Sequence, residues 1–385
     1  MGFSVRKGLL AAISLLISLQ LLVMSSCSCA EDGEQQTSAA VTDETGVSQN
    51  TEITTEPATE SAETLQRRQN LTAQVEEYMD GCDFSGSILI SVDGVTLCEY
   101  YHGFADKANA TPNSASTKIE LGSMTKQFTA AAILLLQEQG KLNVLDTVDE
   151  YIPEYDFAGE LTIENLLNMT SGIPDYLNSM IYLDAIDEID MMEPTDFDSV
   201  LEFANYNGLE FTPGTSYKYS NTNYMLLGEI IARLSGMSYE SFVEENILKP
   251  LEMNNTTMNM NNADAVGYLI DGSEGDKSDT TYFGAAGEMA ATAIDINKWL
   301  CGLAEGKVLS ESSLNQMFYN TGMGYGYGWF ISEGGYYWHT GQSMACYTMD
   351  LMSMDYSTKV IVLSNVDDEN VETICVDLYN MALGI

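Results

Sequence analysis

The sequence has 385 residues, of which 45% are hydrophobic and 10% aromatic, enough to bury the core of an enzyme-sized globular domain. Its 57 acidic and 15 basic residues give a formal charge of −42, which argues against a nucleic-acid partner because phosphate binding needs basic patches. The sequence contains only two histidines, His102 and His339, and this excludes a histidine-rich zinc site.

Residues 1–26 have the pattern of an export signal. A basic start is followed by an uncharged apolar run from Gly8 to Met24, and Cys27 comes after two serines. This order resembles the cleavage site of bacterial lipoproteins, so we expect a diacylglycerol on Cys27 that anchors the exported chain to the outer face of the cytoplasmic membrane. Cys29 is a weaker candidate for lipidation. A simple secretory signal and an uncleaved anchor remain alternatives.

Residues 27–66 are rich in Ser, Thr, Glu and Ala and contain no Lys or Arg. Such a segment cannot bury enough apolar surface to offset the entropy of ordering, so we predict a flexible acidic stalk. The folded domain is then expected at 67–385. The cysteines of this domain match no metal or redox spacing and are expected to be small buried side chains.

The predicted strands gather at the two ends of this domain. A helix is expected at about 65–79, followed by a hairpin of strands 86–92 and 95–101 around Asp93-Gly94. Further strands are expected at 325–331, 336–339, 346–352 and 359–363, before a final helix at about 371–383. The stretches between are mostly helical, at 123–139, 162–169, 198–206, 223–234, 239–248 and 293–305. This order predicts an α+β fold, with an antiparallel sheet built from both chain ends, flanking helices and an inserted helical subdomain.

Ser123-Met-Thr-Lys126 is the first candidate for chemistry. A Ser and a Lys three residues apart at the start of a helix lie on one face, and a buried amine with a lowered pKa can take the hydroxyl proton. The same spacing occurs by chance at Ser4-Val-Arg-Lys7 in the export signal. Ser123 differs because it opens an almost wholly apolar helix, which would bury Lys126.

Tyr219-Ser-Asn221 is the second element. A phenol can act as a base near neutral pH only if cations lower its pKa, and we expect Lys126 to do so. Asn221 is expected to hold a substrate amide. Tyr176-Leu-Asn178 has the same pattern, but Tyr219 is preferred because it lies between Pro213-Gly214 and a predicted helix.

His339-Thr340-Gly341 is the third element and lies on a predicted strand. Glycine at a strand edge lets a substrate backbone approach closely, and the N–H groups just beyond it and at Ser123 could form an oxyanion hole. Taken singly, His339 is more often a structural residue. The three elements in this order are far more specific than any one of them.

Together these elements resemble the serine β-lactamase and penicillin-binding-protein superfamily, in its class C-like branch with DD-carboxypeptidases, D-aminopeptidases and esterases. The similarity runs from Phe84 to the C-terminus. It includes Phe-Ser-Gly-Ser-Ile-Leu-Ile near the start, Leu-Leu-Asn-Met-Thr-Ser-Gly-Ile-Pro-Asp-Tyr from Leu166, and Tyr-Gly-Tyr-Gly-Trp-Phe before the His-Thr-Gly element.

The resemblance implies a serine hydrolase that forms an acyl-enzyme with an amide, lactam or ester carbonyl, without a metal or organic cofactor. Ser123 would be the nucleophile, with Lys126 and Tyr219 sharing the general base work. Asn221 and Thr340 would bind the substrate, and the N–H groups of Ser123 and Gln342 would form the oxyanion hole. The partner would be a peptidoglycan peptide, a β-lactam or an ester.

Two departures from relatives bear on the substrate. Gln342 replaces a common glycine and is expected to narrow the site, while His339 replaces the Lys of true β-lactamases and would grip a carboxylate less firmly. Peptidase or esterase activity is therefore favoured over antibiotic hydrolysis. Glu164 matches a class A β-lactamase element in the wrong chain order, so we interpret it as a helix-face residue. A non-catalytic penicillin-recognising or wall-binding protein is the alternative, and a surface adhesin explains none of the motifs.

Overall fold

A computed structural model describes residues 61–185 and 189–385. The predicted export signal, Cys27 and nearly all of the predicted stalk lie outside these residues. Within the described ranges, no helix combines the length and the apolar character needed to cross a bilayer.

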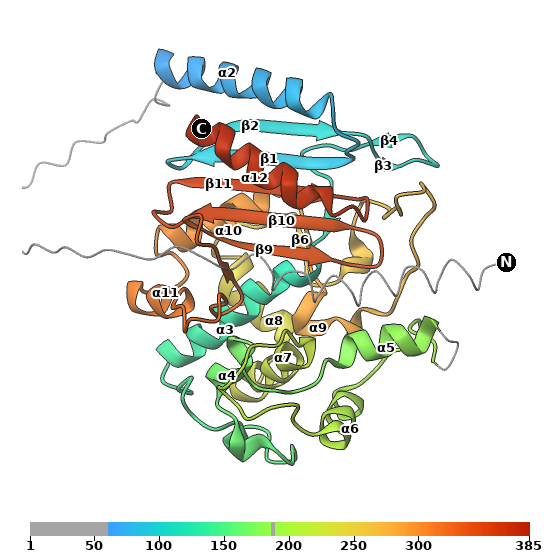
Figure 1. The fold of residues 1–385 in the computed structure, drawn as a ribbon, viewed down its shortest axis with the longest axis vertical. Coiled ribbons are helices and arrows are strands. Elements are labelled where there is room, and N and C mark those ends of the chain that lie inside the picture. The colour runs from blue at the N-terminus through green and yellow to red at the C-terminus, as the bar shows by residue number, and fades with distance from the viewer. Residues whose placement is uncertain (1–60, 186–188) are drawn as a thin grey trace, which may run out of the picture. The chain divides into compact units, whose positions relative to one another are not determined.

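A six-stranded antiparallel sheet forms the centre of the domain, in the order β2-β1-β11-β10-β9-β8. The light-blue and cyan strands β1 and β2 from the N-terminal end lie beside the orange-red strands from the C-terminal end (Figure 1). Its strands are β1 (Gly86–Val92), β2 (Val95–His102), β8 (Phe330–Ile331), β9 (Tyr336–Gln342), β10 (Tyr347–Ser353) and β11 (Thr358–Ser364). The predicted α+β class and the joining of both chain ends in one sheet are confirmed.

The hairpin between β1 and β2 follows from its Asp-Gly turn. Asp93 and Gly94 have φ angles of 52° and 77°, the left-handed conformations that a two-residue hairpin requires. The next pairing of β1 is with β11, from Gly86 opposite Ser364 to Val92 opposite Thr358. These two strands are buried along their whole length because helices cover both faces of the sheet.

One face of the sheet packs against α2 and α12, and the other against α3 and α10. The helices are α2 (Ala62–Met79), α3 (Thr125–Glu138), α4 (Ile163–Leu167), α5 (Tyr176–Ala185), α6 (Phe197–Asn207), α7 (Asn221–Ser235), α8 (Tyr239–Val243), α9 (Gly284–Gly287), α10 (Ala293–Ala304), α11 (Glu311–Met317) and α12 (Asn370–Leu383). Helix α3 is the most buried, since its residues from Thr125 to Leu134 are all inaccessible to solvent. Helix α2 begins at Ala62, so residues 62–66 are helical although their composition assigned them to the stalk.

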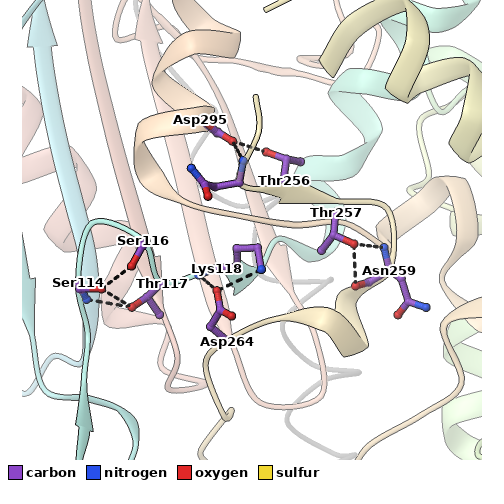
Figure 2. A network of polar contacts seen from close by, with 10 residues as sticks. Ser114, Ser116, Thr117, Lys118, Thr256, Thr257, Asn259, Asp264 and Asp295 are labelled. Carbon is purple, nitrogen blue, oxygen red and sulfur yellow. Dashed lines mark hydrogen bonds and ion pairs between the residues drawn. The ribbon is translucent and has the colours of Figure 1, made fainter. Parts of the chain in front are cut away.

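A small sheet leads the chain into α3. Strands β5 (Ile119–Glu120), β7 (Ala290–Ala291) and β6 (Thr256–Thr257) pair in that order. Figure 2 shows the polar contacts at its ends: Lys118 pairs with Asp264 at 3.3 Å, and Asp295 accepts from the Thr256 hydroxyl at 3.1 Å. The first contact lies just before β5 and the second at the start of β6, and β5 is followed by the 3₁₀ turn Gly122–Met124.

The predicted strand at 325–331 is the main error in the fold. Only Phe330–Ile331 is a strand, because two glycines shape an irregular segment that packs closely on its neighbours. A Cβ at Gly326 would lie 2.4 Å from the Met317 carbonyl, and one at Gly328 would lie 2.7 Å from the Lys126 carbonyl. The glycines therefore serve close approach to α3 and α11 instead of strand pairing.

Candidate active site

Ser123 lies in the 3₁₀ turn between β5 and α3, and Lys126 follows in the first turn of α3. The Lys126 Nζ lies 2.9 Å from the Ser123 Oγ. This turn rests on β9, where glycines remove the side chains that would separate the two segments. A Cβ at Gly341 would lie 1.7 Å from the Leu121 carbonyl oxygen, and a Cβ at Gly122 would lie 2.6 Å from the Gln342 carbonyl oxygen.

A hydroxyl from the neighbouring strand joins the same two segments. Thr348 on β10 donates to the Leu121 carbonyl at 3.0 Å and lies 3.2 Å from the Gly341 carbonyl. Thr348 is fully buried, so this contact is shielded from water. The position of Ser123 relative to β9 is thus fixed by backbone packing and by one shared hydroxyl.

The Lys126 amine is fully buried and has a partner for each of its three protons. Besides Ser123, it donates to the Asn221 Oδ1 at 2.8 Å and to the Ala286 carbonyl at 2.7 Å. Burial lowers the pKa of Lys126 to about 7, and the field of Asp175 opposes that shift. A substantial fraction of Lys126 is therefore a neutral amine near neutral pH, which can accept a proton from an adjacent hydroxyl.

Tyr219 lies just before α7, with its ring centroid 4.9 Å from the Lys126 Nζ. Burial raises the pKa of Tyr219 well above its ordinary value, while the nearby Ser123 hydroxyl lowers it. The expectation that the pKa of Tyr219 would be lowered was wrong, because burial is the largest influence on it and raises it. The phenol oxygen is buried and has no partner of hydrogen-bond geometry among the described residues. In this state it is a protonated hydroxyl held beside Ser123 and Lys126.

His339 is buried on β9 and bonded at both ring nitrogens. Its Nδ1 lies 2.5 Å from the Thr340 carbonyl and its Nε2 lies 2.9 Å from the Tyr325 hydroxyl. A carbonyl can only accept, so Nδ1 carries the proton and Nε2 accepts from Tyr325. Burial and the positive charge of Lys126 lower the pKa of His339 to about 3, so the imidazole is neutral.

The remaining residues of the third element divide between the two faces of β9. Because side chains alternate along a strand, Thr340 and Gln342 face away from the side that His339 occupies. The Gln342 amide is exposed and donates to Asp367 at 2.9 Å. Its engagement with Asp367 gives no support to the expectation that this side chain narrows the site.

The structure brings Ser123, Lys126, Tyr219 and Asn221 into one cluster, with His339 beside it. It does not bring in Tyr176, whose hydroxyl bonds Thr195 at 3.0 Å in a separate apolar cluster. Glu164 lies on α4 and accepts from the Tyr327 hydroxyl at 2.7 Å, as suits a residue on a helix face.

Asp175 was not identified as a site residue from the sequence. Its carboxylate accepts from the Asn221 Nδ2, at 3.3 Å for Oδ1 and 3.1 Å for Oδ2. The Pro-Asp-Tyr sequence stood within a segment that resembles relatives, but nothing local indicated that this carboxylate reaches Asn221. In the described ranges, no cluster of His, Cys, Asp and Glu suited to a metal ion occurs.

Comparison with known proteins decides the family. The profile of the family described as Beta-lactamase matches residues 71–377. The chain belongs to this family. It is a serine hydrolase of the β-lactamase and penicillin-binding-protein superfamily, as its sequence motifs predicted.

Relatives and solved structures agree with this assignment. The putative penicillin-binding protein PbpX of Bacillus subtilis (strain 168) is 29% identical over 349 residues, covering 88% of this chain and 84% of the relative. The crystal structure of a penicillin binding protein from Bacillus halodurans matches with a TM-score of 0.70 and 24% identity, covering 80% of this chain and 98% of that one. D-amino acid amidase from Ochrobactrum anthropi SV3 matches with a TM-score of 0.69 and 23% identity, covering 84% and 99%. At 24% and 23% identity, the two structures show the fold alone.

Proposed function

We propose that this serine hydrolase acylates Ser123 with Lys126 as the general base. The observation that carries the proposal is the 2.9 Å contact between the Ser123 Oγ and a fully buried amine whose pKa burial lowers to about 7. An ordinary lysine, with a pKa near 10.4, would be almost wholly protonated at neutral pH and unable to accept the proton. Burial in α3 therefore supplies the base without any histidine.

The proposed reaction has two halves. In the first, the Ser123 oxygen attacks the substrate carbonyl carbon while its proton passes to Lys126, and the protonated phenol of Tyr219 is placed to donate to the departing group. The phenol then regains its proton from the Lys126 ammonium. In the second half, water attacks the acyl carbon, its proton returns through the same groups, and the Ser123 oxygen leaves as a hydroxyl. We propose the backbone N–H groups of Ser123 and Gln342 as the oxyanion hole.

We further propose an amide or ester as the scissile group, with a weaker grip on any substrate carboxylate than a lysine at the position of His339 would give. His339 is neutral, and Lys126 is the cation whose field reaches it. A substrate carboxylate would find no permanent cation at this position. The names of the relatives include penicillin-binding proteins and a D-amino acid amidase, which supports an amide substrate of the cell-wall peptide kind over an efficiently hydrolysed antibiotic.

Export and lipid anchoring remain part of the proposal. The order of the first 27 residues supports a diacylglycerol on Cys27 that holds the domain on the outer face of the cytoplasmic membrane. Replacement of Cys27 by Ala should move the protein from the membrane fraction to the medium. Retention of Cys27→Ala in the membrane fraction would show that another segment anchors the chain.

The central experiment is covalent labelling followed by a substrate panel. The domain would be treated with a fluorophosphonate and with a fluorescent penicillin, and the modified residue would be located by mass spectrometry, with Ser123→Ala as the test and the exposed Ser116→Ala as the matched control. Hydrolysis of a p-nitrophenyl ester, a D-Ala-D-Ala peptide and nitrocefin would then be compared. Label on Ser123 with ester or peptide turnover supports the proposal. Equal turnover by Ser123→Ala would contradict the assignment of Ser123 as the nucleophile. A clear preference for nitrocefin would contradict the proposed substrate class.

A further inference from the structure

Asp175 occupies a fixed position beside the cluster around Ser123. It lies directly before α5, where its Oδ1 accepts from the Asn178 backbone N–H at 3.4 Å and its Oδ2 accepts from the Asn178 Nδ2 at 2.8 Å. A carboxylate bonded in this way at the start of a helix is restrained in both position and rotation. The first turn of α5 thus holds an acidic group against α7, on which Asn221 is the first residue.

The contact with Asn221 determines which way that amide faces. The Asn221 Nδ2 donates to both oxygens of Asp175, and its Oδ1 accepts from the Lys126 Nζ at 2.8 Å. A carboxylate only accepts and an ammonium only donates. The reversed amide would set its oxygen against the carboxylate and its NH₂ against the amine, so both contacts would be repulsive whenever Lys126 is charged.

We propose that Asp175 is a positioning residue that holds the Asn221 oxygen toward Lys126 and stabilises the ammonium formed when Ser123 loses its proton. The inference rests on the proposed function and adds to it a chain of contacts, from carboxylate to amide to amine to hydroxyl. No proton moves along the amide. Asp175 acts through orientation and through its charge.

The other groups that face Lys126 are neutral and cannot take this role. They are Tyr219, Tyr224 and His339, which come from the loop before α7, from α7 itself and from β9. Burial raises the pKa of both phenols well above the neutral range, and the imidazole is uncharged. Asp175 is therefore the acidic group whose field acts on Lys126, and that field raises the pKa of the amine against the effect of burial. Burial raises the pKa of Asp175 itself, while the hydrogen bonds from Asn178 and Asn221 and the charge of Lys126 favour its carboxylate form.

The pH dependence of turnover tests the proposal. Asp175→Asn removes the charge and keeps the shape, so the pKa of Lys126 should fall and the acidic limb of kcat/KM should move to lower pH by about one unit or more. The plateau value should also fall by roughly ten- to a hundredfold, because the Asn221 amide is no longer held in one orientation. Asp184→Asn is the matched control. It is the same change in the last turn of α5, at a carboxylate that accepts only from the Met191 N–H among the bonds described for it.

The exchanged pair Asp175→Asn with Asn221→Asp gives the sharpest result. It places the carboxylate directly against Lys126 and lets the new amide at position 175 donate to it. The acidic limb should then move above its wild-type position, and part of the lost rate should return. If Asp175 had a purely structural role, the acidic limbs of the single and the exchanged variants would not move in opposite directions.

Each outcome has a defined meaning. An acidic limb that stays within about 0.2 pH units in folded Asp175→Asn, or equal profiles for the single and exchanged variants, overturns the proposal. If Asp175→Asn does not fold, Asp175→Ser keeps an acceptor for the Asn178 N–H, and its acidic limb should show the same downward shift. Failure of the proposed function is distinguishable, because the wild-type protein would then carry no label on Ser123 at any pH.

Discussion

Gly341→Ala is the substitution that most directly tests how β9 and the turn bearing Ser123 fit together. A Cβ at this position would lie 1.7 Å from the Leu121 carbonyl oxygen and 2.6 Å from the Thr348 hydroxyl. The backbone oxygen cannot rotate away as a flexible side chain would. To reach the 3.4 Å of an ordinary contact, the two segments must separate by about 1.7 Å.

The expected loss follows from this displacement. Misplacing a catalytic group by about 1 Å can cost roughly 100-fold in rate, equal to about 2.7 kcal/mol in the barrier, and this separation exceeds 1 Å. Overpacking should cost only about 1–3 kcal/mol of stability, so the variant should still fold. We therefore expect kcat for ester hydrolysis to fall by about 100-fold or more, with labelling of Ser123 slowed to a similar degree.

The control is Gly159→Ala, because a Cβ there would meet its nearest neighbour at 3.8 Å. Both variants would be measured by thermal unfolding, by initial rates with a p-nitrophenyl ester and by the rate of fluorophosphonate labelling. A folded Gly341→Ala variant that keeps kcat within about threefold of wild type would refute the reasoning, since such a displacement should cost far more.

Three further outcomes are expected. The acidic limb of kcat/KM should lie near pH 7 because the base is Lys126, and Lys126→Arg should be inactive since guanidinium stays protonated. A kcat/KM that does not change from pH 6 to 8 would contradict this assignment. Met169→Leu should lower kcat by roughly tenfold with about 1 kcal/mol of lost stability, because the buried Met169 sulfur accepts from the Ser220 N–H at 3.5 Å next to Tyr219. The control is Met352→Leu, at another fully buried methionine, which should leave the rate unchanged. Equal rates in the two variants would show that the sulfur contact is unimportant. Burial raises the pKa of Asp350 to about 7, so its proton binds more tightly in the folded state, and the free energy of unfolding should fall by up to about 4 kcal/mol as pH rises from about 4 through 7. In urea unfolding, Asp350→Asn should lack this part of the pH dependence. Parallel curves of unfolding free energy against pH for the wild type and Asp350→Asn would argue against it.

The parts of the fold that the sequence predicted depend on local chemistry. Asp93-Gly94 between two β-rich runs specified the hairpin, and the apolar run after Ser123 specified the central helix. The segment 325–331 was predicted as a strand from its local sequence. Its conformation depends instead on contacts of Gly326 and Gly328 with segments distant in the sequence, which no local pattern reveals.

The site, like the fold, has features that the local sequence predicted and features that depend on distant contacts. Spacing placed Ser123 and Lys126 on one face, and chain order brought in Tyr219 and Asn221. The direction of the phenol pKa was missed because it depends on burial, a property of the assembled structure. Asp175 was missed because its partner lies 46 residues away and its own neighbours suggest only the start of a helix.

Because β1 pairs with β11, folding of the central sheet requires residues near the C-terminal end of the chain. Gly86 and Ser364 are 278 positions apart, so the central sheet cannot close until almost the whole chain is available. Contacts of such long sequence range form slowly, since a large loop must first be closed. A chain cut short before β11 would lack the strand next to β10, and with it the support behind Thr348 and the turn that carries Ser123. Hydrolytic capacity should therefore appear only once the chain has been made through β11.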